Sequence, residues 1–314
     1  MTKHELKLLG GPGGLRVPAE TLLETVGALL EGARQATRFV VDGESTRKGP
    51  RPAWLDAACR MEVTGLTAGS AVIAIEAPTL EEAIPERFES GGSESMFFHG
   101  GADAIARRTA IDVFAGVLSA AIGGRAEQVL ADRPLLDTCV RFVRASGSAF
   151  DGIQLGGLAG PQPRLTVRRE DARRIELLRD ETPAPQAVRV TGILDTISAT
   201  RSDIVLALPS GEKITARVED HDPARLKSLF GARVVVSGVA RFRPTGRVLV
   251  VDVEHISEAR AADALFETLP VASQTLGIAP SVTQDDDSGV STFFGTWPGE
   301  ETEEELLTAL EAVG

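Results

Sequence analysis

The first 180 residues alternate between strand-like and helix-like patterns of apolar positions. Alternating or β-branched runs typical of short strands occupy residues 4–9, 60–66, 70–77, 150–155 and 163–168. Apolar spacing predicts helices from Pro18 to Ala33, over 102–122 and over 134–145, with a charged helix over 170–180. The apolar run at 39–41 ends at Asp42-Gly43, a turn signal. A short helix that carries Trp54 is expected after Pro50 and Pro52. We therefore predict one α+β domain over 1–180.

A second pattern begins after the proline-containing linker at 181–186. Alternation predicts strands at 188–197, 204–208, 213–218, 233–242 and 247–256, with a short helix at 222–230 after the third strand. Three strands, a helix and two strands is the order of a small OB-like five-stranded β-barrel, which we assign to 187–260. Phe230, at the end of the short helix, is expected to plug its core.

The periodic pattern of apolar residues ends after the predicted barrel. Residues 261–299 are rich in Ser, Thr, Asp and Gly and are predicted to form a flexible linker. Residues 300–314 then predict an acidic amphipathic C-terminal helix, in which Thr302 and Glu305 fit a capping box. The whole chain is thus expected to be α+β, with a partly disordered tail that ends in a helix.

Composition and charge narrow the class of protein. At 314 residues, with 43% hydrophobic residues and few aromatics, the chain has room for two domains with aliphatic cores. Nine of its 45 acidic residues lie between Ser281 and Gly314, a stretch without Lys or Arg, so the net charge of −12 is concentrated in the tail. No apolar run approaches the roughly 20 residues of a membrane span, and no signal peptide is visible. We expect a cytoplasmic protein without a membrane partner.

Motifs that carry catalysis are not found in the sequence. The histidines at 4, 99, 221 and 255 are scattered, and neither a phosphate-binding loop nor a nucleophile elbow is present. Cys59 and Cys139 lie in apolar helical segments and are expected to be buried free thiols. We predict no catalytic residue, cofactor or metal, and no enzyme. A concave site that gathers Arg51, Trp54 and His99 would revive the enzyme hypothesis, although Trp54 is expected to be a core anchor.

Basic residues gather at the last hairpin of the predicted barrel. Arg241, Arg243 and Arg247 lie close together there and could contact a phosphate backbone, DNA or RNA. OB barrels bind single strands through a basic groove and stacking aromatics. Residues 186–260 nevertheless carry eleven basic and nine acidic residues, and their aromatics are only Phe230 and Phe242. Nucleic-acid binding is therefore kept as the alternative function.

The C-terminal segment has the strongest features of a binding peptide. Three aromatic residues, Phe293, Phe294 and Trp297, precede the acidic run that contains Glu300, Glu301 and Glu304. An apolar stripe follows at Leu306, Leu307 and Leu310. An isolated short helix is marginal in water, so these groups must be buried against the protein's own body or against another protein. The long polar spacer favours docking on a partner, with the aromatics as anchors.

This segment, Phe294-Gly-Thr-Trp-Pro-Gly-Glu-Glu-Thr-Glu-Glu-Glu-Leu-Leu, resembles the C-terminal tails of bacterial antitoxin-like proteins encoded beside PIN-domain toxins. The resemblance covers 15–20 residues of the tail, and the barrel looks like that of uncharacterised bacterial proteins that carry such a tail. PIN domains are Mg²⁺-dependent ribonucleases, and their antitoxins wrap a C-terminal peptide around them. Small antitoxins add a DNA-binding N-terminal domain, whereas the large domain here shows no recognition helix.

The resemblance implies a role for each part of the tail. Phe294 and Trp297 would fill apolar pockets on the toxin, and the leucines would pack the helix. The carboxylates of residues 300–305 would meet a basic rim and compete with RNA phosphates. We therefore predict a non-catalytic regulatory protein, an antitoxin or inhibitor that binds a partner such as a PIN-domain ribonuclease.

Overall fold

The computed structural model describes residues 1–11, 17–47, 49–67, 71–88, 102–124, 126–147, 150–159, 163–198, 202–218, 222–270 and 272. Residues Met1–Ala272 form one compact unit. The predicted C-terminal helix and all of the tail residues named above lie outside the described residues.

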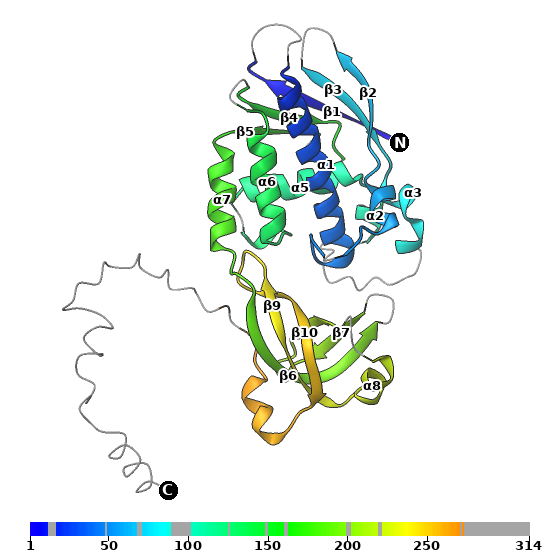
Figure 1. The fold of residues 1–314 in the computed structure, drawn as a ribbon, viewed down its shortest axis with the longest axis vertical. Coiled ribbons are helices and arrows are strands. Elements are labelled where there is room, and N and C mark those ends of the chain that lie inside the picture. Colours follow the sequence, from blue (N-terminus) through cyan, green and yellow to red (C-terminus); the bar gives the residue numbers. More distant parts are fainter. Residues whose placement is uncertain are drawn as a thin grey trace, which may run out of the picture. The chain divides into compact units, whose positions relative to one another are not determined.

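The N-terminal part of this unit is a five-stranded antiparallel sheet with helices on one face (Figure 1). Its strands are β1 (Thr2–Leu9), β2 (Glu62–Thr67), β3 (Val72–Ala77), β4 (Gly152–Gly156) and β5 (Arg164–Arg168), in the order β2-β3-β1-β4-β5. In β1, His4, Leu6 and Leu8 are buried, whereas Lys3 and Glu5 are exposed. This period of two is expected of a sheet that is packed on one face only.

Helices supply the second layer. They are α1 (Ala19–Asp42), α2 (Ala53–Ala58), α3 (Leu80–Ala83), α4 (Ala102–Ala106), α5 (Ala110–Ile122), α6 (Arg133–Arg144) and α7 (Asp171–Glu181), with the short 3₁₀ helices η1 (Pro85–Arg87) and η2 (Ala126–Gln128). Helix α1 packs against α5 and α6, and α6 packs against α7. Phe114 of α5 and Phe142 of α6 meet edge to face, with ring centroids 5.4 Å apart. Aliphatic residues make up most of this core, as the composition predicts.

The second part is a closed five-stranded barrel. Its strands are β6 (Gln186–Ser198), β7 (Asp203–Ala207), β8 (Lys213–Arg217), β9 (Arg233–Phe242) and β10 (Val248–Glu258), with α8 (Pro223–Ser228) between β8 and β9. The order of three strands, a helix and two strands agrees with the sequence prediction. Strand β10 pairs with β8 in parallel and with β9 antiparallel, which closes the ring.

Several local predictions differ from the structure. The helix predicted from Pro18 to Ala33 continues to Asp42. The helix predicted over 102–122 is divided into α4 and α5, because Thr109 caps the start of α5. Phe230 follows α8 and is 59% exposed, because Leu226 and Leu229 of the same turn fill the barrel core instead. The flexible linker was predicted to start at residue 261, whereas residues Ala261–Phe266 form the 3₁₀ helix η3. Arg189 of β6 holds η3 in place, since it pairs with Asp263 at 2.8 Å and lies over the ring of Phe266.

Both cysteines agree with the prediction. Cys59 and Cys139 are free and buried. Burial raises the pKa of the Cys59 thiol to about 12 and also raises the pKa of Cys139. Both side chains therefore act as small apolar groups of the core at neutral pH.

Candidate functional site

The turn that ends α1 places two polar residues in the protein interior. Gly43 adopts a left-handed conformation (φ 80°), and its amide donates to the carbonyl oxygen of Phe39 at 2.8 Å. Glycine reaches this conformation without a steric penalty, so the helix stops abruptly here. The chain then leaves the helix axis and carries Glu44 and Ser45 into buried positions.

Ser45 is fixed by the carboxylate of Asp132. Its backbone amide donates to Asp132 Oδ2 at 2.9 Å, and its hydroxyl donates to Oδ1 at 2.5 Å. Asp132 is also the N-cap of α6 and accepts the amide of Leu135 at 3.1 Å. One buried carboxylate thus joins the end of α1 to the start of α6, and it makes the position of Glu44 rigid.

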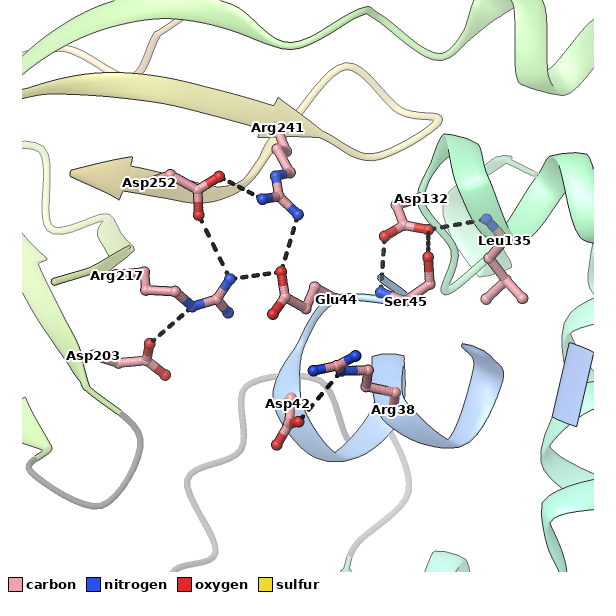
Figure 2. Close-up of polar contacts among 10 residues, drawn as sticks. All are labelled: Arg38, Asp42, Glu44, Ser45, Asp132, Leu135, Asp203, Arg217, Arg241 and Asp252. Carbon is pink, nitrogen blue, oxygen red and sulfur yellow. Dashed lines mark hydrogen bonds and ion pairs between the residues drawn. The ribbon is translucent and has the colours of Figure 1, made fainter. Parts of the chain in front are cut away.

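Glu44 is the centre of an ion-pair network with residues of the barrel (Figure 2). Its Oε2 lies 2.6 Å from Arg217 Nη1 and 2.9 Å from Arg241 Nη1. Arg241 also pairs with Asp252 Oδ2 at 2.6 Å, and Arg217 lies 3.5 Å from Asp252 Oδ1 and 3.7 Å from Asp203 Oδ1. The side chain of Glu44 is completely buried, and that of Arg217 is 7% exposed.

Each charge of this buried network is stabilised by its oppositely charged partners. Burial acts to lower the pKa of Arg217, but the attraction of Glu44, Asp203 and Asp252 outweighs it, and the net shift is upward. Arg217 is therefore charged at every physiological pH. Two buried opposite charges stabilise each other only while both are present, because either one alone would keep its full desolvation cost.

A pocket of about 390 Å³ opens beside this network. It is lined by four arginines, two aspartates, an indole and three small residues: Arg38, Arg47, Arg87, Arg217, Asp42, Asp203, Trp54, Pro50, Pro52 and Ser202. Ser202 has a positive φ of 55°, which is uncommon for a residue other than glycine. The arginines come from α1, the turn after it, η1 and β8, so the pocket exists only in the folded chain.

Asp42 stands between two of these arginines. Its Oδ2 lies 3.8 Å from Arg38 Nε and its Oδ1 lies 3.8 Å from Arg87 Nη1. Arg87 also lies over the Trp54 ring, 5.0 Å from its centroid. Burial raises the pKa of Asp42, and the opposing attraction of Arg87 and Arg38 only partly compensates for it.

The residues of the predicted basic hairpin have different environments. Arg241 is engaged by Glu44 and Asp252. Arg243 is half-buried, and burial together with the nearby charge of Arg247 lowers its pKa. Arg247 is exposed. The hairpin therefore does not present three exposed guanidinium groups on one surface.

The sequence hypothesis of an enzyme site around Arg51, Trp54 and His99 is met only in part. Trp54 lines the pocket, whereas Arg51 pairs with Asp56 at 3.4 Å. His99 lies outside the described residues. Among the residues that the structure describes, no group of three or more His, Cys, Asp or Glu side chains is arranged to hold a metal ion. In the same part of the chain, no helix has both the length and the apolar character needed to cross a membrane.

Comparison with known proteins does not assign the chain to a family. No protein-family model, no curated protein and no solved structure matches the chain.

Sequence reasoning missed the residues that form this site, namely Glu44, Arg217, Asp42, Arg38 and Arg87. Only the Asp42-Gly43 pair had been singled out, as a turn signal. Glu44 and Arg241 are separated by 197 positions, and no periodic pattern connects them. Their pairing arises from the packing of the barrel against the end of α1.

Proposed function

We propose that this protein is a non-catalytic regulatory binding protein that docks its C-terminal segment on a partner protein. The partner class that fits the tail is a PIN-domain ribonuclease. This protein would inhibit it as an antitoxin inhibits its toxin. The OB-like barrel and the α+β domain would form the rigid body that carries this segment. The cytoplasm is the compartment proposed for it.

One observation supports this proposal over nucleic-acid binding. The alternative needs Arg241, Arg243 and Arg247 to face a phosphate backbone together, but Arg241 is held by Glu44 and Asp252 and Arg243 is half-buried. Removing Arg241 from Glu44 would cost the stabilisation of a fully buried carboxylate. The aromatic, acidic and apolar residues of the tail then remain the strongest binding feature of the chain.

The proposed docking uses three kinds of contact. Phe293, Phe294 and Trp297 would be the buried anchors, since large aromatic residues dominate the energy of protein interfaces. Leu306, Leu307 and Leu310 would pack one face of a helix into a groove. The carboxylates of Glu300, Glu301 and Glu304 would steer the tail toward a basic surface such as one that binds RNA.

A pull-down from native lysate tests the proposal. The baits are the full chain, a chain truncated after Ala279, a Phe294→Ala/Trp297→Ala variant and a Ser288→Ala control in the same tail. We expect a small protein to be retained by the full chain and the control but not by the other two. The purified protein should have ribonuclease activity that only the first two baits inhibit.

Two further outcomes decide the details. Equal retention by the full and truncated chains, or nucleic acid eluting with both, would contradict the proposal and favour the barrel surface. Charge reversal in the tail should weaken inhibition of the ribonuclease at low salt, where surface charges are least screened. The variant replaces Glu300, Glu301 and Glu304 with Lys. Unchanged inhibition would show that these carboxylates do not compete with RNA.

A further inference from the structure

The pocket beside the ion-pair network is rich in arginine. Four guanidinium groups and only two carboxylates line it, so positive charge exceeds negative charge on its walls. Its volume of about 390 Å³ lies within the range of small-molecule sites, roughly 300–1,000 Å³. This feature does not depend on the C-terminal segment.

Two of the arginines retain hydrogen-bonding capacity. The 3.8 Å separations from Asp42 to Arg38 and to Arg87 are too long for hydrogen bonds. Arg38 is 11% exposed, and its buried Nε has no hydrogen-bond partner among the described residues. Both guanidinium groups line the pocket, so an oxyanion there would accept hydrogen bonds from the N–H groups that they present to it.

Part of the pocket lining is apolar. It consists of Trp54, Pro50 and Pro52, and Trp54 is half-buried with Arg87 over its ring. Arginine is the preferred residue for phosphate, because its planar fork of donors matches the oxygen geometry. An indole and two prolines provide a surface for the organic part of such a ligand.

We propose that this pocket binds the phosphoryl group of a phosphorylated small molecule, with Arg38 and Arg87 as its principal donors. Arg217, Ser202 and Asp203 belong to the barrel, and the other lining residues belong to the α+β domain. The ligand therefore bridges the two parts of the compact unit. Since it binds only the folded state, it stabilises that state in proportion to its occupancy.

Thermal unfolding and calorimetric titration of the full chain test the site. The probes are inorganic phosphate and a nucleoside monophosphate, each compared with chloride at equal ionic strength. We expect both phosphates to raise the melting temperature and chloride not to do so. Tighter binding of the nucleotide identifies an organic phosphate as the ligand, and equal binding identifies phosphate alone.

Three variants make the test specific. Arg87→Gln should weaken phosphate binding about tenfold or more, because charge-assisted hydrogen bonds are lost. Asp42→Asn should tighten it, because the carboxylate that competes for both arginines is removed. Arg60→Gln, which alters an exposed pair with Glu62, is the matched control and should leave binding unchanged.

The pattern of these variants decides the proposal. Arg87 is partly exposed, so its replacement is compatible with folding, and circular dichroism of each variant checks this. The proposal is overturned if phosphate shifts the melting temperature no more than chloride does. It is equally overturned if Arg87→Gln binds phosphate as the unmodified chain does.

Discussion

At the scale of single residues, burial changes the acid–base properties of a few side chains. Asp42 loses solvent at the end of α1, and its pKa rises although arginines surround it. His4 of β1 is 2% exposed and lies 3.0 Å from the Thr109 hydroxyl through its Nε2. Burial lowers the pKa of His4, and the attraction of Asp112 only partly opposes the shift. Both groups therefore link the stability of the fold to pH.

The first prediction concerns Asp42. Its pKa in the folded chain lies above its ordinary value of 3.8, so ionisation costs more in the folded state than in the unfolded state. The contribution of Asp42 to wild-type stability should fall as pH rises from below 3.8 through the folded pKa, and Asp42→Asn should lack this contribution. The melting temperature of the variant should exceed that of the wild type more at about pH 7 than at about pH 3.5. A difference independent of pH would contradict this account.

The second prediction concerns His4. The unfolded chain protonates this residue near its ordinary pKa of 6.5, whereas the folded chain does so only at lower pH. The contribution of His4 to the free energy of unfolding is therefore fully present above pH 6.5. It is lost as pH falls toward the folded pKa, by up to about 1.4 kcal/mol per pH unit. Urea midpoints measured between about pH 7.5 and pH 5 should fall less in His4→Gln than in the wild type. The exposed His255→Gln serves as the control and should follow the wild type.

At the scale of elements, the close packing of α1 against α5 limits the size of the side chains that α1 can carry at the contact. Gly32 of α1 is buried and faces Phe114 of α5. A Cβ atom at Gly32 would lie 2.2 Å from the Phe114 ring, which is itself buried against Phe142. Gly27 lies in the same helix, and a Cβ atom there would meet no other atom within 4 Å.

The third prediction uses these two glycines as a matched pair. Gly27→Ala should stabilise the protein by about 0.5–1 kcal/mol, because alanine favours a helix over glycine. Gly32→Ala should destabilise it by about 1–3 kcal/mol, because the added methyl group overpacks the core. Chemical denaturation of both variants measures the difference. Equal gains in stability would show that α1 and α5 can separate at no cost.

The order of elements along the chain was predictable, whereas several local details were not. Apolar periodicity at 2 and 3.6 residues predicted the five strands of the first sheet, the four longer helices of that domain and the barrel strands, because it reports which face of each element is buried. It misplaced Phe230, since an apolar residue at the end of a short helix can face either way. It also missed η3, which is fixed by Arg189, a contact across 74 positions to Asp263.

At the scale of the whole molecule, the ion-pair network and a shared apolar contact join the barrel to the α+β domain. Leu249 and Val250 of β10 are buried in the core that the sheet and helices form. Glu44 of the α+β domain pairs with Arg217 and Arg241 of the barrel. The two parts should therefore unfold cooperatively.

The fourth prediction tests this coupling. Glu44→Ala leaves Arg217 buried without its main partner and should destabilise the protein by about 3–5 kcal/mol. Arg60→Gln, which breaks an exposed pair, should change stability by less than about 1 kcal/mol. Hydrogen exchange in urea should show that barrel amides open before those of α5 and α6 in Glu44→Ala, but together with them in the wild type. Simultaneous opening in both proteins would mean that the apolar contact alone couples the two parts.

The sequence by itself determined the α+β class, the order along the chain of the strands and helix that form the barrel, and the burial of both cysteines. Each of these follows from local periodicity and composition, which act over a few residues. Only the tertiary structure decided that Glu44 lies between two barrel arginines and that Arg38 and Arg87 line a pocket with Trp54. Ion pairs and pockets join residues far apart in the chain, and their partners are fixed only when the completed elements pack.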